Sequence, residues 1–173
     1  NNPAAGAFAG ERMDAGLDWF SPRRKVERTA SGGGMLDFSA DSGSNHFFVP
    51  EFGYNTKGSG ALSWGITVYG NGGMNTDFPG GQLNCSPLGG PPSANGLCGQ
   101  GSLGVDLSQL IVAPHAAWKL APDHAIGIAP LFAYQRFEMN GAQLFGGLSQ
   151  SPGEVSNRGY DSSTGWGVRV GYQ

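Results

Sequence analysis

Histidine side chains are the first candidates for chemistry, because they exchange protons near neutral pH. The chain has three, His46, His115 and His124, and they are scattered without His-x-x-x-His spacing. No Gly-x-Ser-x-Gly motif supplies a nucleophile, and Gly32–Gly34 is interpreted as a loop because no lysine follows it as in a phosphate-binding turn. A hydrolase that uses His115 with a nearby serine such as Ser108 is the weaker alternative. The sequence therefore predicts a protein that is not an enzyme and has no catalytic residues.

The two cysteines, Cys85 and Cys98, are the other candidates. Both lie in a long polar stretch rich in Gly, Pro, Ser and Asn. Two thiols in such a loop oxidise readily in a periplasmic or surface compartment, and closing a loop of this size stabilises by about 3 kcal/mol in the chain-entropy model. A metal site is less favoured, since neither cysteine has a second cysteine or a histidine at ligand spacing. We predict a disulfide, no metal and no cofactor.

Composition limits the class of protein. Of 173 residues, 39% are hydrophobic and only 13% are charged, whereas charged residues make up roughly a quarter of a typical soluble domain. The net charge of −3 and the lack of a basic stripe argue against a nucleic-acid partner. No run of 18 apolar residues exists, which excludes a transmembrane helix. The first residues contain no signal sequence, so an exported form must have lost it or the sequence omits it.

Six segments alternate apolar with polar or small residues at a period of two, which is typical of β-strands with one apolar face. The faces opposite the apolar ones are rich in Gly, Ala, Ser and Thr, the reverse of a soluble sandwich with a bulky core. An antiparallel sheet packed against another body is the alternative. The apolar positions run through Met13–Trp19, Phe48–Tyr54, Leu62–Val68, Leu110–Leu120, Ile126–Tyr134 and Trp166–Tyr172.

The connections between these segments alternate in length. Three long ones, residues 21–45, 71–104 and 138–162, alternate with tight turns at Asn55–Gly60 and Ala121–His124. This asymmetry is typical of an outer-membrane barrel with short periplasmic turns and long extracellular loops. Aromatic residues near both strand ends resemble interfacial belts, although β-propensity alone also places aromatics there.

The predicted fold is all-β, an antiparallel up-and-down transmembrane β-barrel of which about six strands are present. Six strands are too few to close a barrel, since the smallest that fill their own interior use about eight. The remaining strands must come from the full-length chain or from other copies, because open edges are not tolerated in hydrocarbon.

Several segments resemble the FadL type of outer-membrane transporter, also called the OmpP1/TodX family. These segments are Asn2–Ala4, Met13–Leu17, Phe48–Tyr54, Gly65–Gly73 and Leu107–Pro114. The resemblance implies the N-terminal part of a larger, closed monomeric barrel that passes long-chain fatty acids or hydrocarbons inward. In that family an N-terminal plug shifts and a kink in the wall lets the substrate leave sideways into the bilayer.

The resemblance assigns residues 1–11 to the end of the plug and residues 12–173 to the first six strands. Asn2, Pro3, Ala4 and Phe8 are the expected plug or gate residues. The strand prolines Pro50, Pro114 and Pro130 lack the N–H that a ladder needs, so each is a candidate wall kink or simply a tolerated bulge.

Apolar residues in the long loops are candidates for a substrate-binding groove, or merely pack the loops against themselves. The candidates are Met74, Phe78, Leu83, Leu88, Phe137 and Phe145. The expected function is outer-membrane transport of hydrophobic compounds, and the expected partners are a hydrophobic small molecule, membrane lipid and lipopolysaccharide. A surface-exposed structural or adhesive β-protein that assembles through open strand edges is the alternative.

Overall fold

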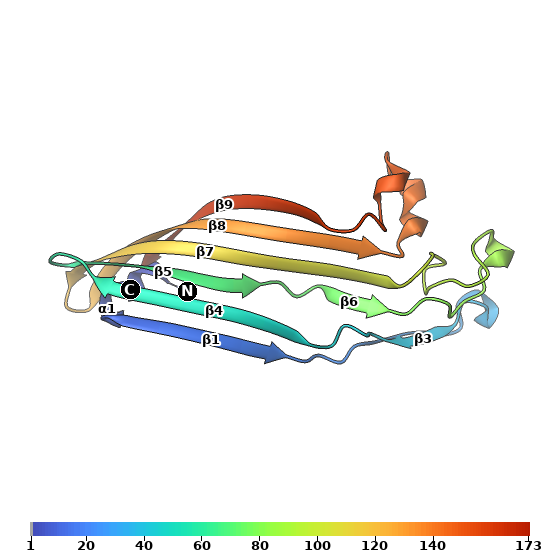
Figure 1. Ribbon diagram of the computed structural model, residues 1–173, viewed down its shortest axis with the longest axis horizontal. Coiled ribbons are helices and arrows are strands. Elements are labelled where there is room, and N and C mark those ends of the chain that lie inside the picture. The colour runs from blue at the N-terminus through green and yellow to red at the C-terminus, as the bar shows by residue number, and fades with distance from the viewer. Residues whose placement is uncertain (1) are drawn as a thin grey trace.

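The computed structural model describes residues 2–173 as one long antiparallel sheet with a short helical segment on one face and ordered loops at one end (Figure 1). Asn1, the first residue of the expected plug, lies outside the described residues. The helical elements are η1 (Pro3–Ala5), α1 (Gly6–Ala9), η2 (Ser31–Gly34), η3 (Ser86–Leu88), η4 (Gln143–Leu148) and η5 (Pro152–Glu154). The strands are β1 (Arg12–Phe20), β2 (Lys25–Arg28), β3 (Phe38–Asp41), β4 (Phe47–Lys57), β5 (Leu62–Asn71), β6 (Asn75–Phe78), β7 (Leu103–Ala121), β8 (His124–Asn140) and β9 (Asp161–Tyr172).

The main sheet has the order β1-β4-β5-β7-β8-β9, and every neighbouring pair is antiparallel. Strand β6 continues the line of β5 and also pairs with β7, while β2 and β3 form a separate hairpin. The predicted all-β, up-and-down arrangement is confirmed. The sheet is open, with β1 and β9 as its two edges among residues 2–173.

The strands extend further into the expected loops than the sequence predicts. β7 has 19 residues and β8 has 17, and both continue through polar residues such as Asp106 and Glu138 that interrupt the apolar alternation. The expected loop 71–104 contains β6, and the expected loop 21–45 contains the β2–β3 hairpin. Apolar periodicity marks only the part of a strand that has an apolar face, so it misses these polar extensions.

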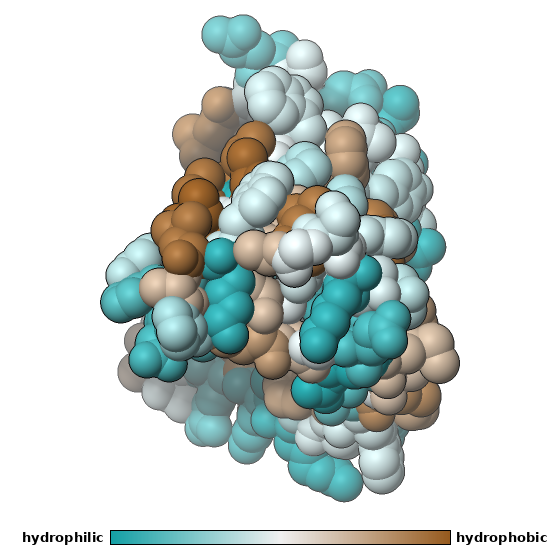
Figure 2. Space-filling model, turned by 90° about the vertical axis from the view of Figure 1, so that its left-hand side faces the viewer, coloured by the Kyte–Doolittle hydropathy of each residue, from teal (hydrophilic) through white to brown (hydrophobic). Residues whose placement is uncertain are grey.

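The register aligns the apolar faces of all six long strands. Residues directly opposite each other in a ladder share a face of the sheet, and the apolar positions pair with one another throughout. The pairs run from Met13↔Tyr54 and Tyr54↔Ile66 through Ile66↔Pro114 and Val112↔Phe132 to Phe132↔Trp166. This face is open to the surroundings: the relative exposure is 71% for Met13 and 84% for Trp166. Figure 2 views the end with the short turns, where apolar residues gather along part of the left edge.

The opposite face is lined by small residues. Ala113, Ala117 and Ala129 are buried on it, and η1 and α1 lie against this face. Gly127 permits the contact, because a Cβ there would lie 2.4 Å from the Ala4 nitrogen. Small side chains therefore let the N-terminal segment approach the sheet closely. No helix among residues 2–173 is long and apolar enough to cross a membrane.

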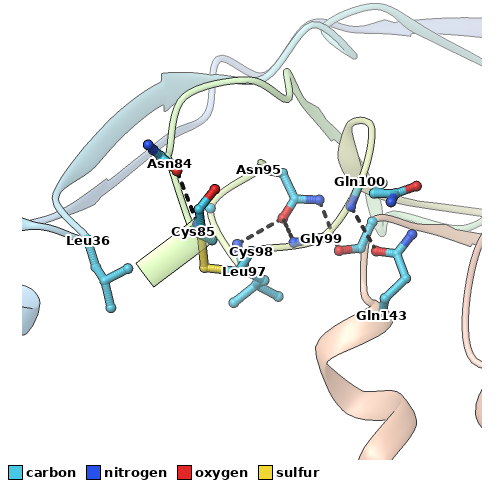
Figure 3. Close-up of a disulfide and its surroundings, with 12 residues drawn as sticks. Leu36, Asn84, Cys85, Asn95, Leu97, Cys98, Gly99, Gln100 and Gln143 are labelled. Atoms are coloured by element: carbon cyan, nitrogen blue, oxygen red, sulfur yellow. Dashed lines mark hydrogen bonds between the residues drawn. A yellow bond between two sulfur atoms is a disulfide. The ribbon is translucent and has the colours of Figure 1, made fainter. Parts of the chain in front are cut away.

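The long loops form a cap at the other end of the sheet (Figure 1), and Figure 3 shows the surroundings of its disulfide. The predicted disulfide between Cys85 and Cys98 is confirmed, with 5.7 Å between the Cα atoms. Leu83, Cys85 and Ala94 form a small core against which Leu36 and Phe38 pack. Close by, Asn95 donates to the carbonyl oxygen of Gly141 at 2.9 Å and accepts from the amide of Gly99 at 3.0 Å, which joins two of the long loops.

Candidate functional site

The main candidate site is an interruption of the sheet between β4 and β5. The ladder of these strands runs from Lys57↔Ser63 only as far as Glu51↔Tyr69. Beyond that point Phe47–Pro50 pair with β1, while Gly70 and Asn71 pair with β7. The two strands therefore diverge toward the cap.

The gap is closed again at its far end. The amide of Gly43 donates to the carbonyl oxygen of Asp77 at 2.7 Å, and Ser42 Oγ accepts from the Asp77 amide at 3.0 Å. We call the opening between these two closures the wall window; it is bordered by residues 44–50 on one side and 70–76 on the other. Pro50 stands at its edge, where it lacks the N–H that would extend the β4–β5 ladder.

A cavity of about 770 Å³ occupies the wall window. Phe48 and Pro50, which belong to the apolar face, line it together with Phe47 and Val49 of the opposite face. The run Gly70–Gly73 lines the other border. Leu110 of β7 and Tyr134 of β8 line it too, so the cavity extends from the gap across the apolar face of the neighbouring strands.

The cavity also has a polar side, toward the cap. Arg24 and Arg136 line it and lie over aromatic rings, with 5.4 Å from the Arg24 guanidinium to the Phe47 ring and 4.2 Å from the Arg136 guanidinium to the Tyr160 ring. The Tyr160 hydroxyl donates to Asp106 Oδ2 at 2.7 Å, and this hydrogen bond to a carboxylate raises the pKa of Tyr160. The cavity thus combines apolar surface with a few oriented polar groups, as ligand sites generally do.

The other two strand prolines face each other across β7 and β8. The register of these strands runs to Val112↔Phe132 and resumes, unshifted, at Ala116↔Ile128. Pro114 and Pro130 fall opposite each other between these pairs, and neither has an N–H to give. We call this interruption the proline seam. The strands stay aligned on both sides of it, and neither Pro114 nor Pro130 lines the wall-window cavity.

A second cavity, of about 380 Å³, lies between the N-terminal segment and the sheet. Polar pairs line it: Arg12 Nη2 lies 2.5 Å from Asp14 Oδ1, and Arg169 donates to the Tyr69 hydroxyl at 3.4 Å. His115 and Asn55 line it as well, with 3.0 Å between His115 Nε2 and Asn55 Oδ1.

Two of the four expected plug residues, Asn2 and Pro3, line this second cavity. Asn2 Nδ2 donates to the Tyr172 carbonyl at 2.9 Å, and Asn2 Oδ1 accepts from the Ala4 amide at 3.0 Å. Pro3 and Ala4 are buried against the sheet. Phe8 is 37% exposed and lies beneath the Lys119 ammonium, at 5.0 Å.

The six expected substrate-binding residues are not brought together around either cavity. Leu83 is buried in the core of the cap, whereas Met74, Leu88 and Phe145 are exposed at separate places. Phe78 lies in β6 and Phe137 in β8, where both are partly buried. Leu83 packs with Cys85 and Ala94 of its own loop, and Leu36 and Phe38 of another long loop pack against this core.

Sequence reasoning missed several residues at the two cavities. Asn55 was assigned to a tight turn, but β4 continues to Lys57, and the alternation through Glu51 and Gly53 places Asn55 on the small-residue face. The enzyme candidates have separate partners, since Ser108 donates to Asp106 and His115 bonds to Asn55. Among residues 2–173, no group of three or more His, Cys, Asp or Glu side chains is placed to hold a metal ion.

No protein-family model matches this chain, and no curated protein matches it either.

Proposed function

We propose that the chain forms part of the wall of an outer-membrane β-barrel that carries hydrophobic compounds inward, in the manner of the FadL-type transporters it resembles. One observation carries the proposal. The register of six strands puts their large apolar side chains on a single exposed face, opposite a face of small and polar residues. In water this arrangement is unfavourable, whereas hydrocarbon is the natural surrounding of such a face.

The wall window gives the proposed transport a route. A hydrophobic molecule gains about 0.8 kcal/mol per CH₂ on entering lipid, so it has little use for an aqueous channel across the whole membrane. An opening within the sheet, lined by Phe47, Phe48 and Pro50, offers it a sideways path between barrel interior and bilayer. The extracellular side is then the cap, and the turns at residues 58–61 and 122–123 are periplasmic.

The proposed barrel needs further strands. β1 and β9 each have one paired neighbour among residues 2–173, and an unpaired edge is costly in hydrocarbon. In the proposal these edges pair with strands of the full-length protein or of other copies, and the N-terminal segment plugs the periplasmic end.

The test begins with extraction. A membrane barrel should remain in the outer-membrane fraction until detergent is added, and its gel mobility should change on boiling. Cells that produce the full-length protein should then take up labelled long-chain fatty acid or aromatic hydrocarbon faster than cells without it, and deletion of residues 2–10 should abolish the difference. A chain that buffer alone extracts would refute the barrel.

The same two open edges favour a second candidate, a surface β-protein that assembles edge to edge. That candidate predicts detergent-free oligomers whose size grows with concentration, and no uptake. This second candidate is excluded if the protein forms a particle of fixed size only in detergent and its cells take up the labelled compound.

A further inference from the structure

Polar contacts hold the N-terminal segment, residues 2–10, on the sheet at both of its ends. Its side chains are small apart from Phe8, which remains 37% exposed, so the apolar surface that it buries is limited to small residues such as Pro3 and Ala4. At one end, Asn2 bonds to the Tyr172 carbonyl. At the other end, a single side chain of β4, Asn55, makes two of the contacts.

Asn55 is buried, with 5% relative exposure, and its amide nitrogen faces two carbonyl oxygens. Nδ2 lies 3.1 Å from the Gly6 oxygen and 2.6 Å from the Gly10 oxygen, at the two ends of the short helix α1. Carbonyl oxygens only accept hydrogen bonds, so the NH₂ group must point at them and both its hydrogens are used. Asn55 therefore clamps α1 at both ends with one group.

This orientation determines the role of His115. With Nδ2 directed at the carbonyls, Asn55 Oδ1 faces His115 Nε2 at 3.0 Å, and an acceptor there requires Nε2 to carry a hydrogen. The order of donors is then fixed: His115 Nε2–H to Asn55 Oδ1, and Asn55 Nδ2–H₂ to Gly6 and Gly10. His115 comes from β7, so the chain of bonds spans three neighbouring strands of the wall.

The space for this contact depends on glycine. A Cβ at Gly6 would lie 2.9 Å from His115 Nε2 and 3.0 Å from Asn55 Oδ1, and a Cβ at Gly65 would lie 2.8 Å from His115 Cε1. Glycine at positions 6 and 65 therefore leaves the room in which Asn55 and His115 contact each other and the N-terminal segment.

We propose that Asn55 is the latch that keeps the N-terminal segment closed over the second cavity, and that His115 is the residue that positions it. Breaking these few hydrogen bonds frees the segment without disturbing the sheet, because the bonds join side chains to the segment and belong to no strand ladder, and because the buried apolar residues of the segment are small. That the latch opens the cavity to the periplasm rests on the proposed function. The hydrogen bonds that form the latch do not depend on transport.

Asn55→Asp tests the latch in the full-length protein in detergent micelles. The substitution keeps the shape but replaces the NH₂ donor by a carboxylate oxygen that faces two carbonyl oxygens. The reporter is Ala4→Cys, because Ala4 is fully buried in the closed segment and both cysteines of residues 1–173 are in the disulfide. Labelling of Cys at position 4 by a maleimide should accelerate about tenfold or more in the Asn55→Asp protein.

Asn84→Asp is the matched control. Asn84 lies in the cap, and its Oδ1 accepts from the Ser86 amide at 3.1 Å, a bond that a carboxylate also makes. Its labelling rate should equal that of the unsubstituted reporter. Equal acceleration in both proteins would overturn the proposal, as would a wild-type rate in folded Asn55→Asp, with folding checked by the change of gel mobility on boiling.

Variants of His115 show whether this residue positions Asn55 or whether any substitution there simply loosens the N-terminal segment. His115→Ala should accelerate labelling to an intermediate rate, and His115→Gln, which keeps an N–H donor, should return it toward the starting value. These variants also serve if Asn55→Asp does not fold; equal rates for Ala and Gln at position 115 contradict the positioning role. Faster labelling combined with no uptake by the wild-type protein would refute the transport function and leave the latch standing.

Discussion

The wall window and the proline seam are two interruptions of the same sheet, and they differ in outcome. At the window, Pro50 ends the β4–β5 ladder, the strands diverge, and a cavity of about 770 Å³ fills the gap. At the seam, Pro114 and Pro130 remove ladder bonds in the middle of β7 and β8, yet the register continues unshifted. Proline alone therefore does not open a sheet.

Glycine and the cap make the difference. The window's second border is the glycine-rich run Gly70–Gly73, whose one side chain, that of Asn71, donates to Gln109 of β7. Its far end is tied to the cap by Gly43 and Asp77. The seam has paired neighbours at both ends, Val112↔Phe132 and Ala116↔Ile128, which hold the strands together. At the window a proline coincides with a glycine-rich partner segment and with a cap that ties the far end, and the seam has neither of the last two.

Filling the window should have the largest effect. Gly73 borders the cavity and a Cβ there meets no atom within 4 Å, so Gly73→Leu adds a large side chain at the border of the window without a clash at Cβ. Uptake of labelled long-chain fatty acid should fall about tenfold, the loss that 1.4 kcal/mol of excluded binding produces. Gly147→Leu is the control, since a Cβ there is equally unhindered and lies in η4, away from both cavities. Similar uptake by the two variants would show that the window is not on the route.

Restoring the ladder at the seam should change stability and not uptake. The double variant Pro114→Val/Pro130→Val returns two N–H groups that face each other, and two hydrogen bonds contribute about 1–3 kcal/mol together. We expect a higher unfolding free energy in denaturant titrations of the folded protein in micelles. Uptake should stay within about twofold. If Pro114→Val/Pro130→Val abolishes uptake, the proline seam and not the wall window is the opening.

Pro50→Val provides the contrast. Its pairing with Leu17 of β1 is uninterrupted, so an N–H at position 50 points away from β1 and into the window, where β5 offers no partner. Replacing any of the three prolines also makes the unfolded chain more flexible, and this effect on the unfolding free energy is the same at each site. Per proline replaced, Pro50→Val should therefore stabilise less than the seam variant; equal gains would mean that the window closes when its proline is removed.

Removing the disulfide should loosen the window and leave the seam unchanged. Cys85→Ala/Cys98→Ala gives up about 3 kcal/mol of loop constraint in the chain-entropy model. The cap core of Leu83 and Ala94 lies a few residues beyond Asp77, so amide hydrogen exchange should rise at Gly43 as well as through residues 83–98. Exchange in β7 and β8 beside the seam should not change. Unaltered exchange at Gly43 would show that the cap does not hold the far end of the window.

The same comparison explains what the sequence predicts. The six long strands and the shared apolar face follow from period-two alternation, and the disulfide from two cysteines in one polar loop. The three prolines were equivalent in sequence, because a missing N–H has the same meaning at each. The outcome at each proline depends on its partner in the neighbouring strand, and only the register supplies that: Pro114 falls opposite Pro130, and Pro50 has no ladder pair in β5.

The binding residues were less predictable for a related reason. Apolar loop residues such as Leu83 and Leu88 attract attention in sequence, but loops fold on themselves and bury or display such residues independently of any cavity. Phe47 and Arg24 line the window because strands that are distant in sequence diverge there. Asn55 was overlooked because a strand that ends in Asn-Thr-Lys-Gly has the composition of a turn.

The smallest expected effect concerns Tyr160. Its hydroxyl bonds to Asp106, which lines the wall-window cavity, and this pair has no counterpart at the proline seam. Its hydrogen bond to Asp106 raises the pKa of the phenol above the ordinary value of about 10, so folding favours the neutral form. The stabilisation is then fully present below about pH 10 and is lost as the pH rises through the folded pKa.

Tyr160→Phe should lower the unfolding free energy slightly at neutral pH, and the difference from wild type should vanish in strongly alkaline solution. Tyrosinate absorbance should show one group fewer with a late titration in the variant. A difference that grows with pH would mean that ionised Tyr160 is the stabilised form, and Asp106 would then not be its partner in solution.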